Sequence, residues 1–169
     1  MPLPSIQGYV CQMPPAINQG RGRGVAAFIR EPLMKIFQGV TSINEPIAQC
    51  LKLSFKPYDV ITVYKTQECT TLANHKQLIQ ILKRLVNLNK PTVIIGDFNF
   101  DYWREKDNLI RRTLEKDGFK QLVKEPTTIR GKCIDHVYIN EKMMKGKYKL
   151  YYPYYTDHEA VRVILKKNQ

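Results

Sequence analysis

Residues 91–101 (PTVIIGDFNFD) are the stretch on which the predicted fold depends. Residues 92–95 are β-branched and mostly apolar, which is typical of a strand that is buried on both faces. Gly96 then allows the backbone to turn, and Asp97 and Asn99 follow two residues apart. Because side chains two apart on an extended backbone point to the same side, the stretch predicts a carboxylate and a carboxamide together at the end of a rigid core strand. A catalytic pair and an Asx-rich turn are both consistent with this pattern.

The length and composition indicate one globular domain. The chain has 169 residues, of which 43% are hydrophobic and 25% charged, as is usual for a soluble protein. It contains no internal repeat, no low-complexity tract and no linker that would divide it. We therefore expect residues 1–169 to form a single domain.

Targeting signals and cysteine usage point to an intracellular protein, in the nucleus or the cytoplasm. No apolar run approaches the roughly 18 residues needed to span a bilayer, so we expect no membrane partner. The N-terminus has neither the basic region nor the apolar core of a signal peptide. The cysteines are far apart and include no Cys-x-x-Cys pair, which indicates reduced thiols and argues against zinc: Cys11, Cys50, Cys69 and Cys133.

The charge balance favours a polyanionic partner. Lys and Arg number 27 against 15 Asp and Glu, a formal net charge of +12, which favours nucleic acid first and anionic membrane surfaces second. Attraction to phosphates carries no information on base sequence. Residues 21–24 (RGRG) favour a hairpin turn that presents two cations over a nucleic-acid-binding Arg-Gly tract, because the alternation is only two units long. Near the C-terminus, lysines interleaved with tyrosines are consistent with phosphate contacts and base stacking, and equally with a solvated strand edge: Lys142, Lys145, Lys147 and Lys149, with Tyr148, Tyr151 and Tyr152.

The apolar pattern predicts mostly short strands with two helices. Strands are expected at 6–13, 25–30, 33–40, 48–55 and 59–64, and closing strands at 119–123, 133–139, 148–155 and 160–165. Leu and Ile at helical spacing predict a helix over 71–89, capped by Thr70 or Thr71 and stopped by Pro91. A second helix is expected over 104–116, with Gly118 as its C-terminal cap.

Three polar clusters lie at the ends of predicted core strands. They are Asp97 with Asn99, Asp135 with His136, and Thr156-Asp157-His158. Carboxylates, a carboxamide and an imidazole are the groups needed for metal-assisted attack on a phosphate. Oxygen ligands suit Mg²⁺ or Mn²⁺, whereas zinc would require more His or Cys.

These clusters carry a family resemblance. The segments GDFN (96–99), IDHV (134–137) and TDHEAV (156–161) resemble, in order and spacing, the last three signatures of the endonuclease/exonuclease/phosphatase superfamily. Weaker features agree: GVAAFIR (24–30) is similar to the family's glycine-led strand, and PTT (126–128) with Gly131 is similar to the endonucleases of non-LTR retrotransposons. The resemblance extends from Gly8 onward. It implies an α/β, deoxyribonuclease-I-like fold: two mostly antiparallel sheets packed face to face, with helices outside.

The resemblance also implies residue roles. Asp97 would orient or deprotonate the attacking water, and Asn99 would hold the scissile phosphate. His158 would stabilise charge on the phosphate, with Asp135 orienting its imidazole, and Asp157 would help to bind the metal. The residues expected to contact substrate are Tyr64, Thr128 and Thr156, the last in place of the family's usual serine. His136 and His75 are expected to be structural or exposed.

One departure from the family pattern concerns the N-terminal part. The family begins with a strand that bears an Asn, a helix, and a strand that bears a metal-binding Glu, and this sequence resembles the family only after that point. Glu31, Glu45 and Glu68 do not occupy the family position. We therefore expect an N-terminally shortened fold, weak binding of Mg²⁺ or Mn²⁺, and apolar sheet surface that a partner chain or domain would cover.

Three functional interpretations remain open. The leading one is a metal-dependent endonuclease that cleaves nucleic acid, DNA in the first place. The second is a catalytically weak remnant that binds nucleic acid through a basic surface. The third is a phosphatase that acts on a small phosphorylated substrate.

Overall fold

The computed structural model describes residues 5–14 and 24–168. The elements, in chain order, are β1 (Tyr9–Gln12), β2 (Ala27–Arg30), the 3-10 helix η1 (Glu31–Lys35), β3 (Phe37–Glu45), β4 (Ala48–Phe55), β5 (Asp59–Lys65), α1 (Leu72–Leu85), β6 (Thr92–Asp97), α2 (Leu109–Lys116), β7 (Phe119–Gln121), β8 (Asp135–Asn140), β9 (Met144–Tyr151) and β10 (Ala160–Lys167). None of the described helices is long and apolar enough to cross a membrane. All four cysteines are free, as expected.

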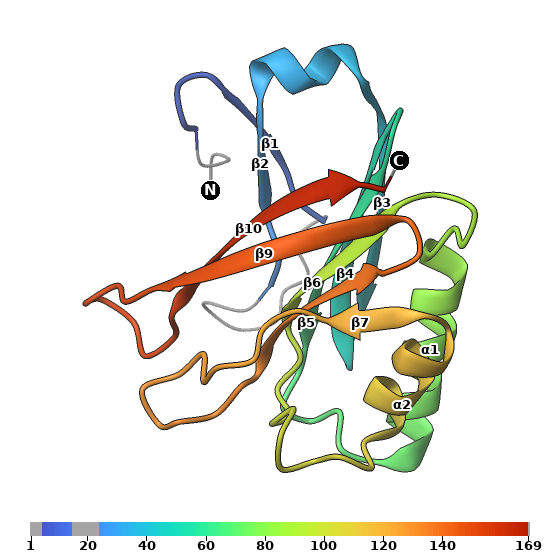
Figure 1. Cartoon of the computed structure of the whole chain (residues 1–169), viewed down its shortest axis with the longest axis vertical. Helices are drawn as coiled ribbons and strands as arrows, with labels where there is room; N and C mark the ends of the chain where they lie inside the picture. Colours follow the sequence, from blue (N-terminus) through green and yellow to red (C-terminus); the bar gives the residue numbers. More distant parts are fainter. Residues whose placement is uncertain (1–4, 15–23, 169) are drawn as a thin grey trace.

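A six-stranded sheet forms the centre of the molecule, in the order β3-β4-β5-β6-β8-β7 (Figure 1). β5 and β6 are parallel and are joined by α1, because a parallel pair requires a crossover connection. The other pairs are antiparallel. α1 and α2 cover one face, where their buried residues Leu78, Leu82 and Ile110 join a core that includes Ile61 and Ile94 of the sheet.

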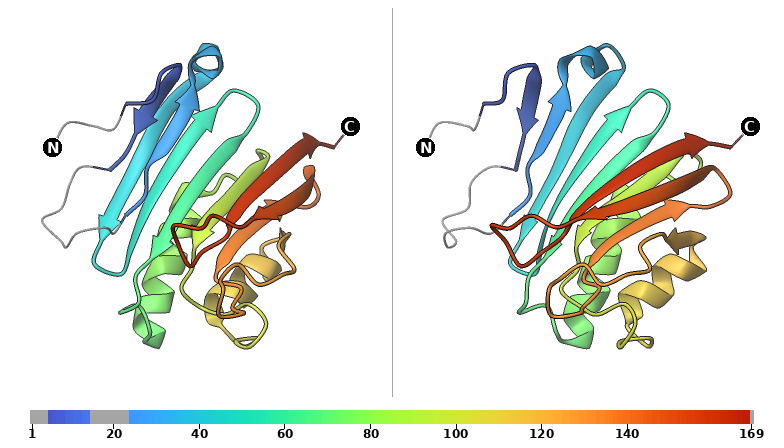
Figure 2. Two further views of the ribbon diagram at one scale, coloured as in Figure 1. Left: turned by 90° about the vertical axis from the view of Figure 1, so that its left-hand side faces the viewer. Right: turned by 60° about the vertical axis from the view of Figure 1, so that its left-hand side comes forward.

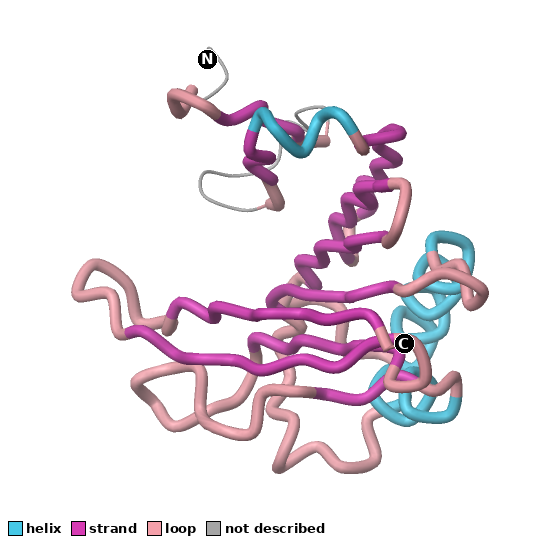
Figure 3. The backbone as a smooth tube through the Cα atoms, turned by 45° about the horizontal axis from the view of Figure 1, so that its top comes forward, coloured by secondary structure: helices cyan, strands magenta, loops and turns pink. Residues whose placement is uncertain are grey.

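A second layer covers the opposite face in two separate pieces, the hairpins β1–β2 and β9–β10. β1–β2 packs through Ile29 onto Leu51 and Leu53 of β4, and β9–β10 packs onto β6 and β8. Figures 2 and 3 show the two hairpins apart, with strands of the central sheet passing between them. The fold is thus the expected two-layer arrangement of sheets with helices outside.

The second layer is interrupted over the middle of the central sheet. Val60 contacts the cores beneath both hairpins, yet it remains partly exposed, as do Thr62 and Ile95 on the same face. In the described part of the chain, β2 pairs only with β1 and β10 only with β9, so each hairpin has a free edge. The second layer thus covers the apolar residues Val60 and Ile95 only in part, and the expected covering by a partner chain or domain stays a prediction.

Several predicted element boundaries were wrong. The strand expected at 33–40 begins only at Phe37, because residues Glu31–Lys35, with Pro32 in the first turn, form the 3-10 helix η1. The helix expected from 104 begins at Leu109, after Asn108 caps it by accepting a hydrogen bond from the Ile110 amide. The strand expected at 148–155 runs from Met144 to Tyr151.

Other local predictions are confirmed. Thr71 caps α1 by accepting a hydrogen bond from the Asn74 amide, and Gly118 follows α2 with a φ of 86°. α1 ends at Leu85, earlier than expected, because the backbone becomes extended at Val86. The hairpin turn predicted at 21–24 lies outside the described residues, apart from Gly24.

Candidate active site

Gly96 allows the strand that carries Asp97 to lie against its neighbour. Gly96 has a φ of 150°, and a Cβ atom there would lie 1.9 Å from the carbonyl oxygen of Val63 on β5. Only glycine tolerates both the backbone conformation and the close approach. The glycine therefore sets the position from which β6 delivers Asp97.

Asp97 and Asn99 form an Asx turn that is part of the site. The Asn99 backbone amide donates to Oδ1 of Asp97 at 2.8 Å, and the Asn99 side-chain amide donates to the Lys65 carbonyl at 2.7 Å. Asn99 has a φ of 48°, a conformation that Asn tolerates better than most residues. A catalytic pair and an Asx turn are therefore compatible interpretations of this stretch, because the turn fixes the carboxylate of Asp97 and the carboxamide of Asn99.

The register of the sheet aligns three of the predicted site residues. Tyr64 on β5 is paired with Asp97 on β6, and Asp97 is paired with Asp135 on β8. Residues directly opposite each other on neighbouring strands share a face. This row lies on the face that the two hairpins cover, because Val137, two residues after Asp135, packs beneath β9–β10.

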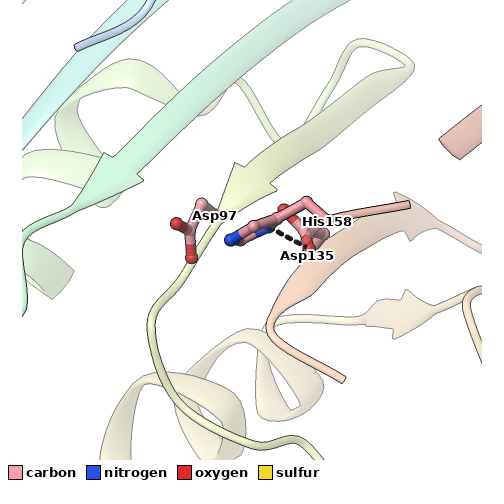
Figure 4. Close-up of side chains that lie close together, drawn as sticks. All are labelled: Asp97, Asp135 and His158. Carbon is pink, nitrogen blue, oxygen red and sulfur yellow. Dashed lines mark hydrogen bonds and ion pairs between the residues drawn. The ribbon is translucent and has the colours of Figure 1, made fainter. Parts of the chain in front are cut away.

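His158 enters the site from the loop between β9 and β10. Its Nδ1 atom lies 2.9 Å from Oδ2 of Asp135, and Figure 4 shows the imidazole between the carboxylates of Asp97 and Asp135. A bridge between Thr128 and His158, and a hydrogen bond from the Ile129 amide to the Asp157 carbonyl at 3.0 Å, fix this loop against the β7–β8 connection. Because an ionised carboxylate only accepts, Nδ1–H is the donor, and Nε2 is left for another partner.

Thr127 positions Asp135, a role that its place in the sequence does not indicate. Its hydroxyl oxygen accepts hydrogen bonds from the backbone amides of Ile134 and Asp135 at 3.1 and 3.0 Å. The side chain is fully buried. The only sequence signal for Thr127 was its place beside Thr128 in the PTT segment. Its hydrogen bonds to the amides of Ile134 and Asp135 form only when the loop between them is folded.

The site perturbs the pKa values of its ionisable groups. Burial raises the pKa of Asp97 to about 6, and it also raises the pKa of Asp135, against the opposing effects of Thr127 and His158. Burial lowers the pKa of His158, but the charge of Asp135 and the hydrogen bond to it outweigh burial, so that this pKa is raised overall. The carboxylate of Asp135 thus favours the protonated form of the imidazole, against the effect of burial.

The same three residues could hold a metal ion. Asp97, Asp135 and His158 each offer a ligand atom, and these atoms lie within 4.8 Å of one another. Two carboxylates fit a hard divalent cation such as Mg²⁺ or Mn²⁺, and the remaining ligands would be water or substrate oxygens. The cluster contains no Glu, and the side chain of Asp157 is exposed and outside it. The role of Asp157 as a ligand therefore stays a prediction.

The remaining predicted residues surround this cluster. The Thr156 hydroxyl accepts a hydrogen bond from the His158 amide at 3.2 Å, and the Thr128 hydroxyl bonds the backbone of Lys132. Their contacts with substrate, like that of Tyr64, stay predictions. His136 is structural, as expected: it is fully buried against Phe98, and burial lowers its pKa to about 4.

The aligned acidic row and the Asp135–His158 pair thus form one polar cluster at the edge of the central sheet. The sequence profile of the endonuclease/exonuclease/phosphatase family matches residues 2–158, and the chain belongs to this family. No curated protein matches the chain.

Solved structures of the same fold show low sequence identity to this chain. The endonuclease domain of TRAS1, a telomere-specific non-LTR retrotransposon, is 16% identical with a TM-score of 0.63, covering 95% of this chain and 79% of that chain. A 3′ phosphatase from Neisseria bound to a product DNA hairpin is 16% identical with a TM-score of 0.65, covering 96% and 80%. The endonuclease/exonuclease/phosphatase from Bacteroides vulgatus is 12% identical with a TM-score of 0.66, covering 95% and 77%.

Proposed function

We propose that this chain is a divalent-metal-dependent phosphodiesterase that cleaves nucleic acid, DNA in the first place, by attack of water on a phosphodiester. The observation that carries the proposal is the Asp135–His158 pair beside Asp97, at the end of the central strand. The family contains nucleases and phosphatases, so that hydrolysis of a phosphate ester is the chemistry common to its members. The net charge of +12 favours a polyanionic substrate over a small one.

We assign to each residue the role that the family resemblance implies. Asp97 orients the attacking water and accepts its proton, and Asn99 holds the scissile phosphate beside it. Asp135 keeps the imidazole of His158 in one orientation, and its charge favours the protonated form, which donates from Nε2 to a phosphoryl oxygen. A bound Mg²⁺ or Mn²⁺ would supply additional charge stabilisation on the phosphate.

We further propose that strands of a partner polypeptide complete the second layer. The free edges of β2 and β10 face a strip of partly exposed sheet that includes Val60, Thr62 and Ile95. An added strand would satisfy edge hydrogen bonds and cover apolar surface together.

A second candidate function, binding of nucleic acid without efficient cleavage, has its own support. The cluster of possible metal ligands lacks a Glu, and the outward face of β9–β10 presents cations. Weak metal binding combined with a basic surface would give tight, salt-sensitive binding and slow chemistry.

A substrate panel distinguishes these functions. Supercoiled plasmid, an oligonucleotide with a 3′ phosphate and a small phosphomonoester are each incubated with Mg²⁺ or Mn²⁺, with Asp107→Asn as a control at an exposed acid outside the site. The proposal predicts that plasmid is hydrolysed faster than the other two substrates, and that the Asp107→Asn control cleaves plasmid at the same rate as the wild type. Salt-sensitive binding without hydrolysis would support the second function, and release of phosphate from the small ester alone would establish a phosphatase.

A further inference from the structure

The loop between β9 and β10 carries the most exposed aromatic side chains of the described residues. Tyr152, Tyr154 and Tyr155 are 64%, 96% and 83% exposed, and all lie within seven residues of His158 in the sequence. Rings this exposed contribute little to the stability of the fold. Tyr154 and Tyr155 contact each other edge to face, with ring centroids 6.1 Å apart. Several exposed aromatic rings close in sequence to His158, for which a catalytic role is proposed, indicate a surface for binding.

The two strands of the hairpin that carries this loop present cations, and the acidic residues of the hairpin, Asp157 and Glu159, lie in the loop. Lys145, Lys147 and Lys149 alternate along the exposed face of β9, and neither β9 nor β10 contains Asp or Glu. The register places Lys149 opposite Arg162 and Lys145 opposite Lys166. Like charges directly opposite each other destabilise a strand pair, and a bound polyanion would relieve this repulsion.

Tyr151 connects the cations to the loop. Its hydroxyl lies 3.5 Å from the Arg162 guanidinium, and the Lys149 ammonium lies 5.1 Å from its ring centroid. Tyr151 is therefore held by neighbouring side chains, whereas Tyr154 and Tyr155 contact one another and solvent. The sequence along the hairpin thus runs from phosphate-binding cations to free aromatic rings and then to His158.

We propose that Tyr154 and Tyr155 form a stacking platform for unpaired bases of the substrate strand, next to the phosphate that His158 contacts, while Lys149 and Arg162 bind neighbouring phosphates. This inference rests on the proposed function and narrows its substrate class to single-stranded or locally unpaired nucleic acid. Paired bases are stacked on their neighbours and have no free face for the rings. A platform of this type tolerates any base, because every base has an aromatic face.

Equilibrium binding in EDTA, where no metal-dependent cleavage occurs, tests the platform. The probes are a fluorescein-labelled oligothymidylate of about 12 nucleotides, within the usual site sizes for single strands, and the same strand paired with its complement. The proteins are the wild type, the pair Tyr154→Ala with Tyr155→Ala, the pair Tyr154→Phe with Tyr155→Phe, and Tyr9→Ala. Tyr9 is a matched control because it is 39% exposed and lies on β1.

The alanine pair should lose at least about fivefold in affinity for the single strand, the lower end of the effect of one stacked base. Affinity for the duplex should change by less than about twofold, and the phenylalanine pair and the Tyr9 control should resemble the wild type, because stacking requires the ring and not the hydroxyl. An unchanged single-strand affinity in the alanine pair, an equal loss on the duplex, or an equal loss in the phenylalanine pair would each overturn the platform. A wild type that binds neither probe would overturn the proposed function itself.

Discussion

Contacts with the backbone hold the polar side chains of the site in place. The Asn99 amide is fixed by the Lys65 carbonyl, and Thr127 fixes the strand end that carries Asp135. Such contacts place groups before substrate arrives, which is what electrostatic catalysis requires. Burial of the Asp97 carboxyl is the cost of this arrangement, because burial disfavours its charged form.

The raised pKa of Asp97 predicts that the site destabilises the metal-free fold at neutral pH. Its pKa is about 6 in the folded protein against an ordinary value of 3.8, so the folded state binds the proton more tightly than the unfolded state. Stability is therefore lost as pH rises through about 6. Asp97→Asn removes this loss and should stabilise the metal-free protein at pH 7.5 by about 1–3 kcal/mol.

Thermal unfolding in EDTA measures this effect. Asp97→Asn should have a higher Tm than the wild type at pH 7.5. The difference should shrink toward pH 4, where the carboxyl of Asp97 in the folded wild type is protonated and as neutral as the amide of the variant. Asp107→Asn, at an exposed position, should show no such trend. A variant that is less stable than the wild type at pH 7.5 would show that Asp97 supports the fold.

The sequence indicated which elements exist better than where they begin. The 92–95 run and the helical spacing of α1 depend on local apolar pattern, and both elements appear in the structure. The η1 helix depends on Pro32 in its first turn, and the late start of α2 depends on the cap at Asn108. The spacing of apolar residues reveals neither. The pairing of Lys149 with Arg162 depends on register, so the sequence showed the cations but not that they face each other.

The like-charge pair on β9–β10 predicts a trade between stability and binding. Arg162→Glu would place an acid opposite Lys149, which should stabilise the hairpin by about 0.2–1 kcal/mol. The same change should weaken nucleic-acid binding and reduce its dependence on salt. Urea unfolding and a salt titration of binding measure the two effects. Lys116→Glu, on α2, is the control, and equal binding losses in both variants would contradict a specific role for the hairpin face.

At the scale of the whole molecule, the second layer is incomplete while the central sheet is continuous. Resemblance at the level of motifs predicted both the fold and an uncovered strip of sheet. The motifs could not predict that the second layer would divide into two hairpins, each with a free edge, because this division depends on which strands pair with each other. The Tyr64–Asp97–Asp135 row of the site lies on the continuous sheet, whereas His158 comes from the β9–β10 loop of the second layer.

The free edges predict uneven protection of backbone amides in the isolated chain. Amides of β5 and β6 have partners on both sides and should exchange slowly with deuterium, whereas amides of β10 that do not face β9 should exchange rapidly. Hydrogen exchange resolved by NMR measures this directly. Slow exchange along both edges of β10 at low protein concentration would contradict an open edge. Protection that appears as concentration rises would identify a second copy as the partner.

The assignment of Asp97 and His158 to the active site is tested most directly by nicking of supercoiled plasmid with Mg²⁺ or Mn²⁺. The proteins compared are the wild type, Asp97→Asn, His158→Ala and the control Asp107→Asn. The proposed mechanism predicts that the wild type and the control nick at the same rate, that chelation stops both, and that each site substitution lowers the rate by about 10²- to 10⁴-fold. Nicking that persists at the wild-type rate in His158→Ala or Asp97→Asn would contradict the assignment of the active site.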